Sequence, residues 1–260
     1  MIYIQKGDYV KIKNDNENCI YIIKEMISSN DRAFLLSGFI YRVSIIEKED
    51  NLILASDEEI KQSIEKEKSI RNKIIKKDER KVKKRYLLGT VMHIDGDEEY
   101  LNKCLELYEE LGVYSYGKCI SEDKIHLEIG KYLIETNADI VVITGHDIYN
   151  NKGLKDINNY LNTMNFIKAI KEVRKLRNDC VVIAGACQSN FEALIANGAD
   201  FASSPKRINI HTFDPAIVAI KVATTSFNRI VEENDLFKYI ENEKDAIGGL
   251  QTKGKMRILL

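Results

Sequence analysis

The chain has 260 residues, of which 44% are hydrophobic and 30% charged, and its 39 Lys+Arg and 40 Asp+Glu leave a formal net charge of −1. This length suits one large domain, or a medium domain with an appendage, and it can bury a core without covalent cross-links. The balanced charge excludes a general polyanion binder, so we expect no nucleic-acid partner. No apolar stretch is long enough to span a membrane, and charges at the N-terminus interrupt the apolar core that a signal peptide needs.

The cysteines indicate a reducing compartment. There are five of them, an odd number, and no two are spaced as a Cys-x-x-Cys pair. This pattern argues against both a disulfide framework and a thiolate zinc site. We therefore expect a soluble cytoplasmic protein that holds no metal and no cofactor.

Residues 1–57 have the pattern of a small β domain. Apolar runs at Tyr9–Lys13, Cys19–Ile23, Ala33–Leu36 and Arg42–Ile46 alternate with turn-forming residues. Strands at this spacing predict a small barrel or curled sheet. The opening Gly7-Asp8-Tyr9-Val10 is typical of SH3-like barrels, so we predict an SH3-like domain here.

Residues 58–85 differ sharply in composition. Between Lys61 and Arg85 there are twelve basic and four acidic residues, and neither Gly nor Pro interrupts them. The segment predicts a solvated, basic helical linker. A local patch for nucleic acid or an acidic partner is the alternative interpretation.

From Tyr86 onward, strand and helix patterns alternate. Strands are predicted at Tyr86–Ile94, Val113–Ile120, Asp139–Thr144 and Asp179–Ala184, and helices at Glu98–Leu111, Ile125–Glu135, Phe166–Arg177 and Phe191–Asn197. The last two strands are unbroken apolar runs, as in a parallel sheet covered on both faces. We predict that residues 86–260 form an α/β domain with a mostly parallel sheet sandwiched by helices. The functional crevice of such a domain lies at the carboxyl ends of the strands.

Two of the predicted strands end in residues that carry chemistry. Gly145-His146-Asp147 follows one, and Gly185-Ala186-Cys187-Gln188-Ser189 follows the other. A thiol nucleophile is usually activated by a histidine, so Cys187 and His146 are the predicted catalytic pair. Ser189 with Glu192 fits a capping box, which would place Cys187 just ahead of a helix N-terminus.

The other cysteines and histidines have simpler interpretations. Cys104, Cys119 and Cys180 read as small buried residues rather than nucleophiles. His93 lies within a predicted strand and reads as a packing residue. His211 lies in a separate loop and is a reserve candidate for the base.

The order of a hydrophobic block, Gly-His, a second hydrophobic block and Ala-Cys is that of caspase-like (clan CD) cysteine peptidases. Longer stretches resemble the YabG family: Leu88–Leu101, Val142–Asp147, Gly185–Ala193 and Ala202–Arg207, followed by Ile210-His211 and Asp214-Pro215. The resemblance covers nearly the whole chain. The YabG family comprises sporulation-specific peptidases of spore-forming Firmicutes.

The resemblance implies a cysteine endopeptidase that cleaves spore coat and cortex-associated precursor proteins, with a preference for Arg at the cleaved bond. Cys187 would attack the carbonyl, and His146 would protonate the leaving amine and later activate water. The backbone N–H groups of Cys187 and Asp147 would hold the oxyanion. Asp147 departs from the wider clan, which has Gly after the histidine.

A preference for Arg requires a carboxylate in the S1 pocket. Residues at the end of the first strand reach that pocket in the caspase-like topology, so Asp95 or Asp97 is our candidate, with Asp147 and Glu192 in reserve. Asp97 has an alternative interpretation as the N-cap of the helix that starts at Glu98.

Two other functions fit parts of the sequence. A glutamine amidotransferase-like hydrolase also carries a cysteine at a strand end, but its Gly-x-Cys-x-Gly elbow is incomplete here. An adaptor, built from the SH3-like domain and the basic linker, would bind coat proteins or nucleic acid and would leave Cys187 and His146 unexplained.

Two segments suggest further behaviour. Asp147–Asn165 is a polar stretch beside His146, and its length favours a mobile loop that gates the substrate. The run Arg80–Arg85 offers arginines at a predicted domain boundary, where an Arg-preferring peptidase could cut itself.

Overall fold

The computed structural model describes residues 4–13, 15, 19–28, 32–76 and 86–259. The chain divides into two compact units, Met1–Asn72 and Lys73–Leu260, and each is described by itself below. The division falls within helix α1 (Asp57–Lys76), which makes up most of the predicted linker. The basic run Arg80–Arg85 lies outside the described residues.

The smaller unit contains a β-sheet, as predicted, and its neighbouring strands are antiparallel. Its strands are β1 (Tyr9–Ile12), β2 (Tyr21–Ser28), β3 (Ala33–Gly38), β4 (Ser44–Lys48) and β5 (Leu52–Leu54), in the order β4-β3-β2-β1-β5. A 3-10 turn, η1 (Glu49–Asn51), joins β4 to β5. Val10, Ile23, Phe34 and Leu36 form its core and are almost fully buried. Strand β5 was not predicted, because three residues are too few to show an alternating pattern.

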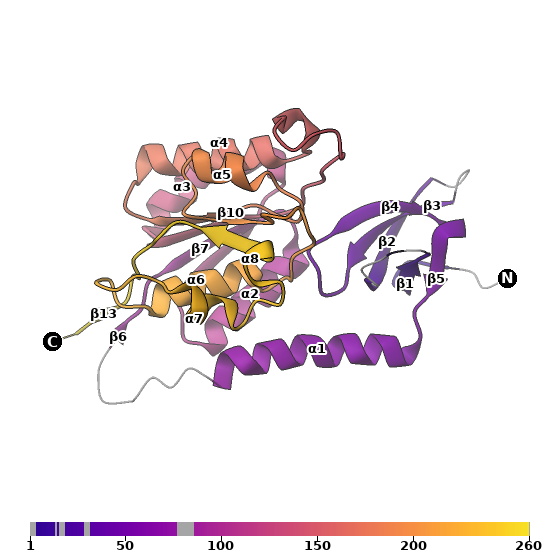
Figure 1. Cartoon of the computed structure of the whole chain (residues 1–260), viewed down its shortest axis with the longest axis horizontal. Coiled ribbons are helices and arrows are strands. Elements are labelled where there is room, and N and C mark those ends of the chain that lie inside the picture. The colour runs from indigo at the N-terminus through magenta and orange to yellow at the C-terminus, as the bar shows by residue number, and fades with distance from the viewer. Residues whose placement is uncertain (1–3, 14, 16–18, 29–31, 77–85, 260) are drawn as a thin grey trace. The chain divides into compact units, whose positions relative to one another are not determined.

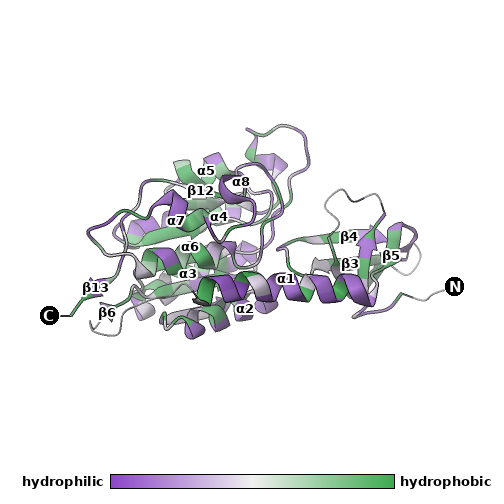
Figure 2. Ribbon diagram, turned by 60° about the horizontal axis from the view of Figure 1, so that its bottom comes forward, coloured by the Kyte–Doolittle hydropathy of each residue, from purple (hydrophilic) through white to green (hydrophobic). Residues whose placement is uncertain are grey.

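Helix α1 begins at a capping box. The Ser56 hydroxyl accepts a hydrogen bond from Glu59 N–H (3.3 Å), and the Glu59 carboxylate accepts one from Ser56 N–H (2.9 Å). Most of the helix is hydrophilic (Figure 2). The composition of the segment therefore gives a polar helix, as expected where neither Gly nor Pro interrupts the chain.

The larger unit is built on a six-stranded sheet. Its strands are β7 (Val91–Asp95), β8 (Ser115–Cys119), β9 (Ile140–Thr144), β10 (Val181–Ala184), β11 (Phe201–Ser203) and β12 (Ile247–Gly249), in the order β12-β11-β10-β9-β7-β8. All neighbouring pairs are parallel except β11 and β12. The predicted mostly parallel α/β sheet is thus confirmed.

The prediction that Tyr86–Ile94 forms a single strand is wrong. The segment is split into β6 (Tyr86–Leu87), which pairs only with β13 (Arg257–Ile258), and β7 of the main sheet. The break falls at Gly89, where an added Cβ would lie 2.6 Å from Lys255 Cβ. Close approach of the C-terminal segment therefore bends the chain at this glycine.

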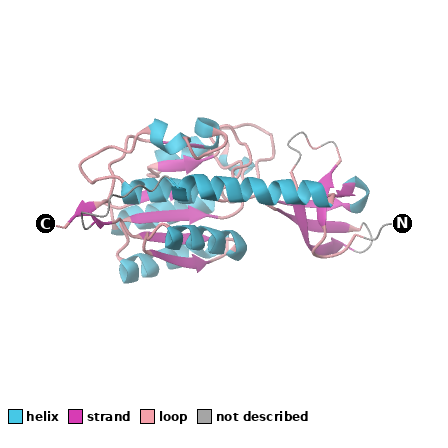
Figure 3. Ribbon diagram, turned by 90° about the horizontal axis from the view of Figure 1, so that it is seen from below, coloured by secondary structure: helices cyan, strands magenta, loops and turns pink. Residues whose placement is uncertain are grey.

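Helices cover both faces of the main sheet (Figures 1 and 3). Helices α3 (Glu122–Thr136), α4 (Thr163–Leu176) and α5 (Phe191–Ala196) lie on one face, and α2 (Glu98–Glu110) and α6 (Asp214–Thr224) lie on the other. The short helices α7 (Glu233–Phe237) and α8 (Glu243–Ala246) follow α6. Ile143, Ile170 and Val182 belong to the fully buried core between the sheet and α3–α5.

The strand order places a topological switch point between β7 and β9. The chain runs from β7 through α2 outward to β8, and then through α3 back to β9 on the other side of β7. Since α2 and α3 cover opposite faces, the carboxyl ends of β7 and β9 form the edge at which open α/β sheets bind their ligands. Among the described residues, no helix combines the length and the apolar character needed to cross a bilayer.

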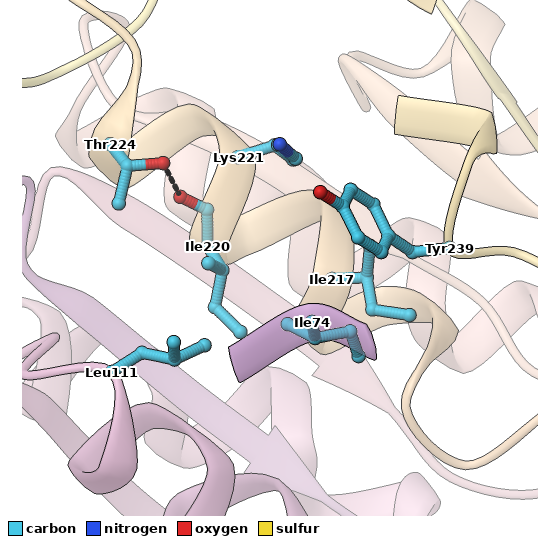
Figure 4. A pocket seen from close by; sticks show the side chains of 7 residues that line it. All are labelled: Ile74, Leu111, Ile217, Ile220, Lys221, Thr224 and Tyr239. Carbon is cyan, nitrogen blue, oxygen red and sulfur yellow. Dashed lines mark hydrogen bonds between the residues drawn. The ribbon is translucent and has the colours of Figure 1, made fainter. Parts of the chain in front are cut away.

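A small cavity lies elsewhere in the larger unit (Figure 4). It measures about 60 Å³ and is lined by Ile74, Leu111, Ile217, Ile220, Lys221, Thr224 and Tyr239. The Lys221 ammonium stands 4.7 Å from the centre of the Tyr239 ring. Its walls are mostly aliphatic and it lies beside α6, so we interpret it as a packing void. It is separate from the strand-end residues described next.

Candidate active site

The sheet register brings His146 and Cys187 to the same edge. Ile143 of β9 pairs with Ala184 of β10, and each predicted catalytic residue follows three positions later on its own strand. The two strands are parallel neighbours, as predicted, so both residues leave the sheet at its carboxyl edge.

The segments that carry the two residues are joined by side-chain hydrogen bonds. Ser189 Oγ donates to Asp147 Oδ2 (2.9 Å), and Tyr149 N–H donates to Gln188 Oε1 (3.2 Å). The Ser189 hydroxyl also accepts from Ala186 N–H (2.9 Å). The turn around Cys187 is thereby fastened to the residues that follow His146.

The Asp147 side chain is the centre of this connection. It is 5% exposed and accepts hydrogen bonds from Ser189 Oγ, Thr163 Oγ1, Asn162 N–H and Ile148 N–H. Burial raises the pKa of this carboxyl group above its ordinary value, although all four hydrogen bonds act in the opposite direction. Within the described part of the chain, the N–H group of Asp147 donates no hydrogen bond.

Cys187 is buried beneath the segment that follows β11. It is 1% exposed, and Ile210 N–H donates a hydrogen bond to its Sγ (3.2 Å). The thiol lies 3.9 Å from the Ile210 carbonyl oxygen. Gln188, next in the chain, has a positive φ of 60°, which bends the backbone sharply after the cysteine.

His146 lies between two carboxylates near the switch point of the sheet. Its Nδ1 is 3.4 Å from Glu122 Oε1 and its Nε2 is 3.8 Å from Asp97 Oδ2. The Nε2 atom forms no hydrogen bond with any described residue, so the resting structure contains no hydrogen bond from it to Cys187. The Tyr100 ring packs against the imidazole at a centroid distance of 5.9 Å.

His93 and Asp95 form a separate, fully buried hydrogen-bond chain. Thr144 Oγ1 donates to Asp95 Oδ2 (2.8 Å), so this hydroxyl accepts from His93 Nε2 (2.8 Å). The Tyr108 hydroxyl lies 3.1 Å from His93 Nδ1 and extends this chain on the other side of the ring. His93 is fully buried, which is compatible with the packing role predicted for it.

The acidic candidates for the S1 pocket differ in exposure. Asp95 is fully buried, and its Oδ1 accepts from Asp97 N–H (2.9 Å). Asp97 Oδ1 caps α2 by accepting from Glu99 N–H and Tyr100 N–H, as the alternative interpretation predicted, while its side chain remains 20% exposed. Glu192, a reserve candidate, pairs with Arg207 at 2.5 Å.

Two predictions from local sequence are wrong. Asn190, not Ser189, caps α5 by accepting from Ala193 N–H (3.1 Å), because Ser189 is turned toward Ala186 and Asp147. Cys119 is exposed rather than buried, since it stands on β8 at the edge of the sheet. Cys104 and Cys180 are buried as predicted.

The polar loop after His146 folds as a hairpin. Tyr149 and Tyr160 form an antiparallel bridge with stacked rings 4.9 Å apart, and Leu161 N–H donates to the Ile148 carbonyl (3.0 Å). The 3-10 turn η2 (Ile157–Asn159) lies at its far end. Ile148 and Leu161 remain exposed on the hairpin.

Sequence reasoning missed Glu122 and the supporting residue Thr163. Both stand at the first position of a helix that follows the carboxyl edge, α3 and α4 respectively. The sequence did contain a signal for Glu122. An acidic residue in the first turn of a helix that starts at the carboxyl edge of the sheet lies close to the strand ends. The reserve base His211 is 2% exposed, and its Nδ1 accepts from Phe213 N–H (3.1 Å) at the start of α6.

The fold and these residues define an α/β protein with a cysteine and a histidine at one edge of a parallel sheet. The chain matches the sequence model of the family described as YabG peptidase U57 over residues 5–260, and it belongs to that family. It is also 39% identical over 178 residues to the sporulation-specific protease YabG of Bacillus subtilis (strain 168). That match covers 66% of this chain and 61% of the relative.

Proposed function

We propose that this protein is a sporulation-associated cysteine endopeptidase with Cys187 as nucleophile and His146 as general acid and base. The observation that carries the proposal is the register of β9 and β10, which brings both residues to one edge of the sheet. Membership of the YabG peptidase family supports proteolysis, and the relative's printed name supports a role in sporulation.

The proposed reaction proceeds through a thioacyl-enzyme. Cys187 Sγ attacks the peptide carbonyl, His146 delivers a proton to the leaving amine, and the same imidazole then takes a proton from the attacking water. Because Cys187 is buried under the Ile210 backbone, substrate reaches Sγ only when the segment after β11 shifts.

The backbone N–H groups of Asp147 and Cys187 are the proposed oxyanion donors. Each belongs to a residue three positions after the last residue of a central strand, β9 or β10. The four hydrogen bonds accepted by the Asp147 side chain fix its peptide group in place, which a preorganised oxyanion hole requires.

Replacement of Cys187 tests the catalytic proposal. Cys187→Ala should abolish thiol-sensitive cleavage of a fluorogenic Arg peptide, because no other group replaces the nucleophile. The wild type treated with iodoacetamide should lose activity in parallel. Cleavage that persists in Cys187→Ala with an unchanged thermal melt would refute Cys187 as the nucleophile.

Asp97 is the better supported of the two carboxylates proposed for Arg recognition. Asp95 is buried and holds the turn before α2, whereas Asp97 keeps one oxygen 3.8 Å from His146. Only a carboxylate that is accessible can pair with a substrate guanidinium.

Asp97→Asn should lower kcat/KM for Arg peptides by about 10–10²-fold, because a hydrogen bond to a charged group contributes about 1.5–3 kcal/mol. Asparagine caps helices as well as aspartate, so the fold should be preserved. Glu98→Gln, an exposed neighbour, is the matched control. An equal preference for Arg peptides in Asp97→Asn and Glu98→Gln would contradict the assignment of Asp97 to the S1 pocket.

We further propose spore coat and cortex-associated precursors as substrates and the cytoplasm of the sporulating cell as the location. The relative's printed name supports sporulation as the setting, whereas the substrates and the location are what the resemblance to the YabG family implies. For the fold, we propose that the antiparallel sheet of the smaller unit is an SH3-like barrel and that the larger unit is caspase-like. The strand-end His and Cys on adjacent parallel strands support the second assignment.

The two alternative functions have less support. Ser189 stands where an amidotransferase-like elbow has its second glycine, and Cys187 is not among the residues with a positive φ, the conformation that the nucleophile takes in such an elbow. An adaptor would give no reason for the fastening of the His146 and Cys187 segments to each other. Family membership also favours a peptidase over both.

A further inference from the structure

We propose that Glu122 is a positioning residue that holds the His146 imidazole in one orientation and one tautomer. This role rests on the proposed function, which supplies the reaction that His146 serves. It would extend the catalytic pair to Cys187, His146 and Glu122.

Glu122 contacts His146 at two points. Its Oε1 accepts a hydrogen bond from His146 N–H (2.7 Å) and also lies 3.4 Å from His146 Nδ1. The backbone contact fixes the carboxylate relative to the strand end, and the second contact directs it at one ring nitrogen. A carboxylate placed this way orients a catalytic imidazole.

Two glycines leave room for this carboxylate. A Cβ added to Gly96 or to Gly145 would clash with the Glu122 carboxylate. These glycines follow β7 and β9, the two strands that border the switch point of the sheet. The Glu122 side chain is 16% exposed, so it occupies a fitted position between the strand ends rather than a solvated one.

The charge of Glu122 persists in this partly buried position. Burial opposes ionisation, but hydrogen bonds to the His146 side chain and backbone outweigh it and hold the pKa of Glu122 below 4.5. Asp97 is the other carboxylate near the ring, on the Nε2 side, and Tyr100 is the aromatic neighbour. At neutral pH, therefore, an anion faces Nδ1.

This arrangement assigns different roles to the two ring nitrogens. An anionic acceptor beside Nδ1 favours the neutral tautomer that carries its proton on Nδ1. The lone pair is then on Nε2, which forms no hydrogen bond with any described residue and is the atom left to exchange a proton with the thiol or the leaving amine. Glu122 also stabilises the imidazolium that forms during the reaction.

The test combines kinetics with nitrogen NMR of the ring. Glu122→Gln should lower kcat on an Arg peptide by about 10²–10⁴-fold, the usual share of a positioned acid–base group, with a smaller change in KM. Glutamine keeps an oxygen for His146 N–H, so the fold should survive. In ¹⁵N-histidine spectra, the His146 signals should move from the Nδ1–H tautomer toward Nε2–H.

Two further variants separate positioning from structure. Glu122→Asp keeps the charge and should recover part of the lost kcat. Asp123→Asn removes an exposed charge from the same first turn of α3 and should leave both kcat and the tautomer unchanged. Gly96→Ala, which displaces the carboxylate, should reproduce the effects of Glu122→Gln.

An unchanged tautomer in Glu122→Gln would overturn the inference, whatever the activity. A kcat equal to that of Asp123→Asn would overturn it as well. If the wild type shows no thiol-sensitive cleavage, the proposed function fails instead. The NMR arm needs no substrate, so it still tests the contact between Glu122 and His146.

Discussion

Single carboxylates in this protein differ mainly in what surrounds them. Asp95, Asp97 and Glu122 lie at the carboxyl ends of neighbouring strands or just beyond them. The first is fully buried in a hydrogen-bond chain, the second caps a helix, and the third contacts His146. The same functional group therefore serves in a buried hydrogen-bond chain, as a helix cap and in the candidate active site.

Glu122 gives the stability of the fold a predictable dependence on pH. Its pKa is lower in the folded protein than the ordinary 4.5, so the unfolded state binds more protons near that pH. The stabilisation from its ionised form is present above pH 4.5 and is lost as the pH falls through the folded pKa. Urea unfolding of wild type and Glu122→Gln should thus show a stability difference that shrinks on acidification. A difference that is constant across this range would contradict the assignment.

At the scale of elements, Asp147 joins three of them. Its carboxylate accepts from the turn before α5 and from the start of α4, and the residue itself lies three positions after the end of β9. The positions of His146 and Cys187 relative to each other therefore depend on one buried side chain.

Asp147→Ala should destabilise the protein by about 2–5 kcal/mol, since each buried donor left without a partner costs about 1–3 kcal/mol. Chemical denaturation measures the change. Asp156→Ala is the control, because Asp156 accepts a hydrogen bond from Asn158 N–H in an exposed turn of the same hairpin. Equal stability of the two variants would show that the Asp147 hydrogen bonds do not hold the elements together.

The helices of the larger unit show where the local sequence pattern is sufficient to predict an element. Helices α2, α3 and α4 were predicted to within a few residues, because their apolar positions repeat with the helical period. The cap of α5 was assigned to the wrong residue. Both Ser189 and Asn190 suit an N-cap, and the tertiary contact with Asp147 decided between them.

At the scale of the whole molecule, the division into two units bears on self-processing. The predicted cleavage run Arg80–Arg85 lies outside the described residues. We expect purified wild type to release fragments that end at Arg80 or Arg85, whereas Cys187→Ala remains intact. Intact-mass measurement after incubation checks this. An uncut wild type that still digests an Arg peptide would leave the run as a connector.

The sequence by itself determined the α/β class, the small N-terminal β domain and the two strand ends that carry His146 and Cys187. Each follows from a local signal, since buried parallel strands are continuous apolar runs and their ends are marked by glycine. Only the tertiary structure decided the partners: Glu122 beside His146, Asp147 across to Ser189, and Asp95 in the core rather than at the surface. These contacts join residues that are 24, 42 and 49 positions apart in the chain. Hydrophobic periodicity cannot predict them, because it describes only the residues within a single helix or strand.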